Sequence, residues 1–455
     1  MVGARSSTSS DRAAQARCRP SRPRRTQHRP CWMEVMASSL LSRTEQFHRR
    51  AERVPGLRRV RRPATSTSPD FDLAYLRPHP RPGAVPVVVV PGGPGLASAL
   101  VYEPFRRRAV AEGLDVIMIE HRGVGLSRHN RTGDDLPPAA ITVTAAVDDI
   151  AAVLEAEDLD TAVLLGSSYG TYLAQGFGLR HPGRVAGMVL DSTVLTAWDH
   201  VAVREHARRL LWHGEEPSTA GLARKLRILV EREGHPVAAL GSAVRILYEF
   251  TSDRLLERYL DHLVVGRAPG THKLLATLGS KELTEDAPFA MEMSLAGRIA
   301  FRELNFAPAP DGMIFDPALD MAPAAGRFPA FEGEPFDLPA ALPRFDWPVA
   351  VLSGDRDLRT PRPVATRTAE LLPDAVLVPV PGLGHSALDT HPGLLRAVTT
   401  AVRDARHREL PARVAELSRL PREGGSSVWI PRIVRASLAT DRLRTAAHGR
   451  PLPRS

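Results

Sequence analysis

Short runs of apolar, mainly β-branched residues recur along the middle of the chain and predict buried strands. Runs that are apolar at every position, rather than at alternate positions, are typical of strands covered on both faces. The predicted strands are 84–90, 115–123, 161–167, 185–192, 347–354 and 375–380. Pro379 lies inside the last run and cannot donate to a sheet ladder, so we expect that strand at a sheet edge.

Segments with helical spacing separate these strands. In 142–157 the apolar residues Val143, Val147, Ile150 and Leu154 recur at helical spacing behind Thr142, a candidate N-cap. A second helix is expected over 170–181, where Pro182 ends it. Because strands alternate with helices, the pattern predicts an α/β fold with a mostly parallel, doubly wound sheet.

The segment between the fourth and fifth strands breaks this alternation. It is rich in Leu, Ala and Arg at helical spacing and then turns to Pro and Gly, which predicts a helical insertion. We therefore expect four parts, with these boundaries: a basic extension, 1–62; a core, 63–194 and 346–404; a helical cap, 195–345; and a basic tail, 405–455.

The net charge of +9 is carried by the two ends. Residues 1–62 contain 16 arginines and 4 acidic residues, and residues 405–455 contain 11 arginines and 4 acidic residues, so the chain between them is net acidic. Basic segments rich in Arg, Pro and Ser are typical of disordered tails, and we interpret both ends in this way rather than as nucleic-acid or membrane binders.

Composition excludes several kinds of site. Cys18 and Cys31 are the only cysteines, so the rest of the chain has no disulfide, catalytic thiolate or cysteine-rich metal site. No apolar run is long enough to span a bilayer, and the segment around Met33 and Met36, two candidate start residues, is a poor secretory signal. We expect a cytoplasmic protein.

The sequence Gly-Ser-Ser-Tyr-Gly at 166–170 follows the third strand directly and begins a helix. It fits the G-x-S-x-G pattern with Ser168 at its centre. The flanking glycines suit a tight, strained turn that larger side chains would crowd. Ser168 is therefore the candidate nucleophile, and Ser167 is its neighbour.

A serine nucleophile needs a base, and the base needs a carboxylate to orient it. Parallel sheets place such groups at the carboxyl ends of strands. The fifth strand is followed by Asp355 and Asp357, and the sixth by His385 in a glycine-rich loop. The order Ser, Asp, His is the one that this architecture requires.

Several motifs together resemble the serine aminopeptidase family of α/β-hydrolases, which includes the proline iminopeptidases and tripeptidyl aminopeptidases. They are PGGPG at 91–95, EHRGVGLS at 120–127, the serine motif with its helix and next strand, LSGDRDLRTP at 352–361 and GLGHS at 382–386. The resemblance implies an α/β-hydrolase fold with a helical cap. It favours Asp357 over Asp355 as the triad acid, because Asp357 matches the family's spacing to Pro361.

The resemblance also implies the oxyanion hole. Its donors would be the N–H groups of Tyr169 and Gly93, with Gly92 the second choice to Gly93. Pro91 stands where the family usually has histidine, so this loop can be held differently here.

Substrate class depends on the cap. An aminopeptidase needs carboxylates for the free amino terminus, and the resemblance points to Glu292, with Glu303 or Asp316 as a second. We expect an aminopeptidase of the proline iminopeptidase type acting on a small peptide. The alternatives are an esterase or other small-molecule hydrolase with the same triad and, third, a non-catalytic binding protein. No cofactor or metal motif is present in the sequence.

Overall fold

The computed structural model of the protein describes residues 43–284, 286–423 and 425–447. Residues up to Glu45 form one unit, of which only 43–45 are described, in helical conformation. Residues from Gln46 onward form a second unit, which contains every element below. The two cysteines and the candidate start residues Met33 and Met36 lie outside the described residues.

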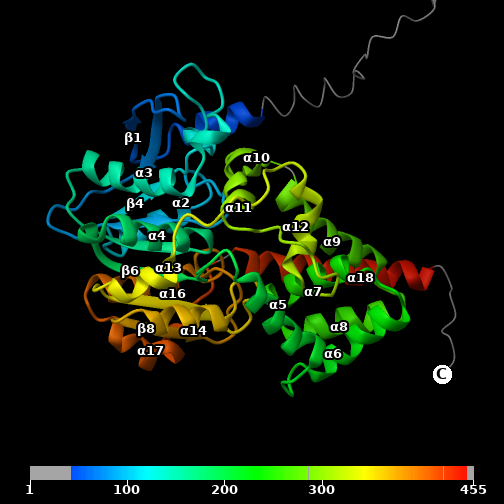
Figure 1. Ribbon diagram of the computed structural model, residues 1–455. Coiled ribbons are helices and arrows are strands. Elements are labelled where there is room, and N and C mark those ends of the chain that lie inside the picture. The colour runs from blue at the N-terminus through cyan, green and yellow to red at the C-terminus, as the bar shows by residue number, and fades with distance from the viewer. Residues whose placement is uncertain (1–42, 285, 424, 448–455) are drawn as a thin grey trace, which may run out of the picture. The chain divides into compact units, whose positions relative to one another are not determined.

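An eight-stranded sheet forms the centre of the second unit (Figure 1). The strands are β1 Leu57–Arg62, β2 Phe71–Leu76, β3 Val87–Val90, β4 Val116–Ile119, β5 Ala162–Ser167, β6 Val185–Asp191, β7 Val349–Gly354 and β8 Ala375–Val380. Their order is β1-β2-β4-β3-β5-β6-β7-β8. Strands β1 and β2 are antiparallel to their neighbours and the others are parallel. The six predicted strands are all present, and β8, which contains Pro379, lies at an edge as predicted.

Helices cover both faces of the sheet, which explains why the central strands are apolar at every position. On one face lie α3 Val143–Ala156, α4 Tyr169–Arg180 and α14 Arg362–Leu371. On the other lie α2 Glu103–Ala111, α16 Pro392–Arg403 and α17 Leu410–Leu417. The predicted N-cap of α3 is confirmed, because Thr142 Oγ1 accepts a hydrogen bond from the N–H of Ala145 (3.1 Å).

The helical insertion lies between β6 and β7, as predicted. Its helices are α5 His200–Arg208, α6 Ala220–Arg227, α7 Val237–Phe250, α8 Asp253–Val264, α9 Pro269–Thr284, α10 Met293–Ala296, α11 Arg298–Arg302, α12 Pro317–Ala325 and α13 Leu338–Ala341. Helices α5 to α9 have a hydrophobic core of their own, separate from the two layers around the sheet. We call 195–345 the cap.

The predicted boundary at residue 62 is wrong, because β1 lies inside the expected basic extension and pairs with β2 along its whole length. Carboxylates meet its four arginines: Arg58 pairs with Glu157, Arg59 with Glu52, Arg61 with Asp70 and Arg62 with Asp149. The four arginines of β1 thus have carboxylate partners within the fold. The prediction of a disordered extension over 1–42 lies outside the described residues.

The predicted basic tail is also wrong as far as residue 447. Its last described part is helix α18, Ser426–Ala447, which runs beside α7 and α9 of the cap (Figure 1). Val434 and Leu438, one turn apart, are buried in the cap core. Asp441 accepts hydrogen bonds from the N–H and the hydroxyl of Thr271 (both 2.8 Å). The arginines of α18 therefore belong to a helix that packs against the cap.

Candidate active site

Ser168 occupies the sharp turn between β5 and α4. Its backbone is left-handed, with φ 53° and ψ −124°, a region that non-glycine residues rarely adopt. A Cβ on Gly166 would lie 2.3 Å from the carbonyl oxygen of Gly170, and one on Gly170 would lie 2.0 Å from that of Val90. Both glycines of the motif are therefore required by close backbone approach, as the sequence predicted.

The structure brings Ser168, His385 and Asp357 together. His385 Nε2 lies 3.0 Å from Ser168 Oγ. His385 Nδ1 lies 3.1 Å from each carboxylate oxygen of Asp357. Asp357 is fully buried and His385 is 9% exposed. A hydroxyl, an imidazole and a carboxylate in this sequence can move the hydroxyl proton onto the imidazole.

The charges of Asp357 and of a protonated His385 stabilise each other. Burial acts to raise the pKa of Asp357, but the charge of His385 and hydrogen bonds from His385, the Thr360 N–H and the Ser192 hydroxyl outweigh it, so the pKa is about 2. Burial acts to lower the pKa of His385, but the adjacent Asp357 carboxylate outweighs it and the pKa is raised. Asp357 is thus ionised at neutral pH and stabilises a proton on the imidazole.

Asp355, the alternative acid, lies elsewhere. Its carboxylate accepts a hydrogen bond from the N–H of Gly382 (2.8 Å), and the residue is exposed. The structure therefore agrees with the family spacing, which selected Asp357.

The predicted oxyanion loop, 91–95, lies against the nucleophile. A Cβ on Gly92 would lie 3.1 Å from Ser168 Cβ. Gly93 has φ +120°, and a Cβ there would lie 2.5 Å from the N–H nitrogen of Gly95, so this position also needs glycine. Tyr169 follows Ser168 as the first residue of α4. The roles of the Gly93 and Tyr169 N–H groups as donors stay predictions.

The cap segment 287–292 holds this loop by backbone hydrogen bonds. The N–H of Glu292 donates to the carbonyl of Gly95 (2.8 Å), and the N–H of Ala97 donates to the carbonyl of Ala290 (3.0 Å). Gly95 has φ +112°, and a Cβ there would lie 2.8 Å from the Glu292 carbonyl oxygen. The cap thus helps to set the loop position despite Pro91.

Glu292, the first predicted substrate contact, has internal hydrogen-bond partners. The residue is only 3% exposed. One carboxylate oxygen accepts from the N–H groups of Phe289 (2.8 Å) and Gly125 (3.2 Å), and the other lies 3.0 Å from Arg128 Nη1. Arg128 also pairs with Asp135 (2.8 Å) and Asp286 (3.4 Å). With these internal partners Glu292 holds the cap segment in place, and its contact with a substrate amine stays a prediction.

Glu303 is likewise engaged within the fold. One of its oxygens accepts from the N–H of Val143 (2.9 Å) at the start of α3, and the other pairs with Arg302. The residue is 8% exposed. It therefore joins the cap to a core helix, and its role in substrate binding stays a prediction.

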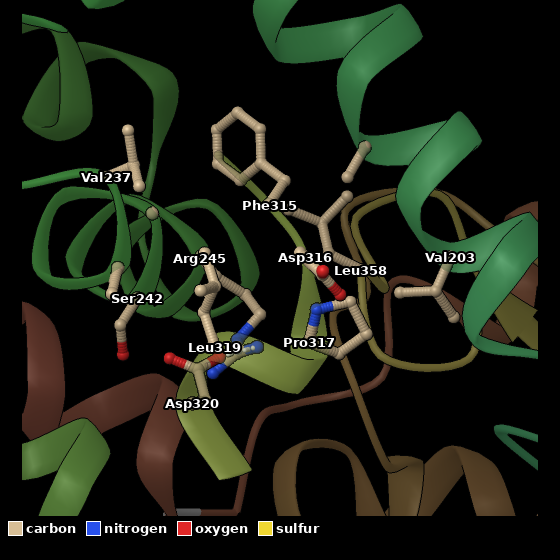
Figure 2. Close-up of a pocket in the computed structure, with 13 residues that line it drawn as sticks. Val203, Val237, Ser242, Arg245, Phe315, Asp316, Pro317, Leu319, Asp320 and Leu358 are labelled. Atoms are coloured by element: carbon tan, nitrogen blue, oxygen red, sulfur yellow. Dashed lines mark ion pairs between the residues drawn. The ribbon is translucent and has the colours of Figure 1, made fainter. Parts of the chain in front are cut away.

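Asp316 caps α12 and lines a cavity between α5, α7 and α12, shown in Figure 2. Its oxygens accept from the N–H groups of Asp311 (2.8 Å) and Ala318 (3.0 Å). In the same cavity Asp320 pairs with Arg245 (2.5 Å). Both carboxylates of the cavity are engaged, and most of the other lining residues are apolar.

Sequence reasoning missed a set of buried polar residues between the catalytic loops. The Asp191 carboxylate at the end of β6 accepts from Ser167 Oγ (2.8 Å) and from the N–H groups of Ala387 (2.8 Å) and Leu388 (3.0 Å). Ser192 Oγ accepts from the N–H of Ser386 (2.9 Å). The rule that identified Asp357, a carboxylate directly after a buried strand, also applies to Asp191 and could have found it.

Within the described ranges there is no group of three or more His, Cys, Asp and Glu side chains that could hold a metal ion. No helix in the described part of the chain is both long and apolar enough to cross a membrane.

Comparison with known proteins supports the fold. Residues 85–218 match the family model described as the alpha/beta hydrolase fold. This segment contains the oxyanion loop and the serine turn. Together with the sheet order and the cap inserted after β6, the match confirms the expected fold.

The similar curated proteins are proline iminopeptidases. That of Heyndrickxia coagulans is 30% identical over 115 residues, which is 25% of this chain and 37% of the relative. That of Neisseria gonorrhoeae is 30% identical over 129 residues, 27% of this chain and 39% of the relative. The matches thus span little more than a third of these relatives.

Similar solved structures include proteins of two activities. The proline iminopeptidase of Mycobacterium smegmatis is 17% identical, covers 78% of this chain and 99% of its own, and has a TM-score of 0.43. A thermophilic esterase from Thermogutta terrifontis is 20% identical, covers 78% of this chain and 99% of its own, and has a TM-score of 0.41.

Proposed function

We propose that this chain, which has the α/β-hydrolase fold, is a serine hydrolase that cleaves its substrate through an acyl-enzyme on Ser168. The observation that carries the proposal is the continuous contact from Ser168 Oγ through His385 to the buried Asp357 carboxylate. Retention of all three groups in contact argues against a purely binding function.

In the acylation step His385 Nε2 takes the proton of Ser168 as the oxygen attacks the substrate carbonyl carbon. The 3.0 Å contact between Oγ and Nε2 provides a direct path for that proton. Asp357 stays ionised, fixes the imidazole through Nδ1 and stabilises the imidazolium that forms. His385 then gives the proton to the leaving group, which departs and leaves the acyl-enzyme.

The negative charge on the substrate oxygen would be met by the N–H groups of Gly93 and Tyr169. Loop 91–95 touches Ser168, and α4 begins with Tyr169, so both groups come from backbone beside the nucleophile. Water activated by His385 then attacks the acyl carbon and releases Ser168, which completes the hydrolysis.

For the substrate, our first proposal is an amide with a free amino terminus, as in a proline iminopeptidase. Its support is the 30% identity to proline iminopeptidases over 115 and 129 residues. The proposal needs amine-binding groups other than Glu292 and Glu303, because those carboxylates already have internal partners.

An esterase or other small-molecule hydrolase is the second candidate, and a specific observation favours it. Every cap carboxylate that the sequence offered for an amine is engaged by arginine or by backbone N–H groups. An ester substrate requires no such carboxylate, while the triad chemistry is the same.

Comparison of the purified protein with its Ser168→Ala variant tests these proposals. The panel holds prolyl, alanyl and tripeptidyl fluorogenic amides, the same amides with blocked amino groups, and short-chain acyl esters. Cleavage of any of these that is lost in Ser168→Ala supports the serine hydrolase. Activity retained by the variant, or none in the wild type, would count against it.

If the protein cleaves any substrate of the panel, its dependence on a free amino group distinguishes the two candidate functions. Loss of cleavage on blocking the amine supports the aminopeptidase. Cleavage of esters whether or not they carry a free amino group, with no cleavage of amides, supports the esterase and contradicts the aminopeptidase.

A further inference from the structure

We infer that Asp191 is a positioning residue of the proposed triad: its buried carboxylate fixes the loop that carries His385 relative to the turn that carries Ser168. This inference rests on the proposed function, because it assigns Asp191 a part in that reaction. It concerns no contact with substrate.

The sheet order explains why such a link is needed. Ser168 follows β5, and His385 follows β8, so β6 and β7 separate the two in the sheet. Neighbouring strands lie about 4.8 Å apart. The 3.0 Å contact between Ser168 Oγ and His385 Nε2 therefore depends on a long loop after β8 that reaches back across two strands.

Asp191 is the last residue of β6, beside β5, and it contacts both parts. Its carbonyl accepts from the N–H of Ser168 (2.8 Å), and its carboxylate accepts from Ser167 Oγ (2.8 Å). The same carboxylate accepts from the N–H groups of Ala387 (2.8 Å) and Leu388 (3.0 Å), two and three residues after His385.

Neighbouring contacts strengthen the link. Ser167 Oγ lies 3.0 Å from Ser386 Oγ, and Ser192 Oγ joins the Ser386 N–H to Asp357. Ser168, Ser192 and Ser386 all have positive φ, of 53°, 58° and 62°. Backbone strain of this kind persists only where surrounding contacts determine the conformation, and here the contacts converge on the end of β6.

The carboxylate itself is essential to this arrangement. Burial raises the pKa of Asp191 to about 6, against hydrogen bonds from Ala387, Leu388 and Ser167 that lower it. At pH 8 it is ionised and accepts from three donors. An asparagine would present an amide N–H₂ to at least one of these donors, so the His385 loop would shift.

The test compares Asp191→Asn with wild type at pH 8, by steady-state kinetics and by the rate of inactivation by a fluorophosphonate, which reports Ser168 reactivity without substrate binding. We expect both kcat and the inactivation rate to fall on the order of 10- to 100-fold, with KM within about twofold, because small misplacement of reacting groups slows chemistry by such factors.

Asp199→Asn is the matched control. Asp199 also accepts from two backbone N–H groups, those of Leu195 and Thr196, and from the Thr196 hydroxyl, and burial raises its pKa. We expect its kcat to stay within about twofold of wild type, whatever the loss in melting temperature. An equal fall in kcat in both variants would overturn the inference, since it would reflect general loss of structure.

Ser167→Ala decides the question if Asp191→Asn does not fold. It removes the Ser167 Oγ contacts with Asp191 and with Ser386 and leaves the Asp191 carboxylate in place. We expect about a three- to tenfold fall in kcat with KM unchanged. Wild-type kcat in Ser167→Ala, or in a folded Asp191→Asn, would contradict the inference. A wild-type protein that does not react with the fluorophosphonate would instead contradict the proposed function.

Discussion

Two groups of buried carboxylates can be compared, one at the carboxyl ends of the core strands and one in the cap. Asp357 and Asp191 accept hydrogen bonds from the loops that carry Ser168 and His385. Glu292 and Glu303 accept from arginines and from backbone N–H groups that join the cap to the core. Members of both groups are almost fully buried.

The two groups of carboxylates differ in their hydrogen-bond partners and not in their burial. A carboxylate beside a neutral imidazole gains most when that imidazole becomes charged, so its stabilisation grows during the reaction. A carboxylate beside an arginine is neutralised at all times and contributes to the folded state instead. In the core group Asp357 is therefore placed to support the imidazolium, and Asp191 is placed to hold the two loops that carry Ser168 and His385. The cap group joins the cap to the core.

The largest expected effect comes from Asp357→Asn, with Glu303→Gln as its counterpart in the cap. Loss of the Asp357 charge removes the support for the imidazolium, and we expect kcat to fall by about 10⁴-fold. We expect kcat of Glu303→Gln to remain within a few-fold of wild type, while its stability to urea decreases. Steady-state kinetics measures kcat, and urea unfolding measures stability. Similar kcat values for the two variants would contradict the distinction between core and cap carboxylates.

A pH profile is the next test. His385 accepts the Ser168 proton only when neutral, and Asp357 raises its pKa above the usual 6.5. We therefore expect kcat/KM to fall about tenfold per pH unit below an apparent pKa higher than 6.5. Below pH 6 the fall should become steeper, because Asp191, with a pKa of about 6, is then protonated and no longer holds the His385 loop. Asp357, with a pKa of about 2, stays ionised over this range and adds no second limb. A profile that is flat down to pH 5 would contradict this account of the core group.

Much of the core could be predicted from the sequence, because its strands are buried on both faces and read as continuous apolar runs. The strand-end rule and the order of motifs pointed to Ser168, to His385 and to Asp355 or Asp357, and the family resemblance favoured Asp357. Strand β1 could not be found in this way, since its arginines on a half-exposed edge strand read as a charged tail. Helix α18 was missed for the same reason, although Val434 and Leu438 mark its buried side.

The cap carboxylates show a different limit. A glutamate in a helical segment gives no sign of which cation it meets, and Arg128 lies 164 residues from Glu292 in the chain. Only the packing of the cap against the core shows that Glu292 pairs with Arg128.

The smallest expected catalytic effect is that of Glu292→Gln. The substitution weakens the contact with Arg128, and we expect a loss of about 1–3 kcal/mol in the free energy of unfolding. We expect KM for free-amine and amine-blocked substrates to change by the same factor, because the Glu292 carboxylate is occupied by Phe289, Gly125 and Arg128. A selective rise in KM for free-amine substrates would return Glu292 to the substrate site and break the comparison.

The most direct test of the central claim is to label the protein with a fluorophosphonate and locate the modified residue by peptide mass spectrometry. The account predicts one label, on Ser168, that is lost in His385→Ala. Ser167 should stay unmodified, because its hydroxyl is buried and donates to Asp191. A label on Ser167, or on Ser168 with an undiminished rate in His385→Ala, would contradict a triad built from Ser168, His385 and Asp357.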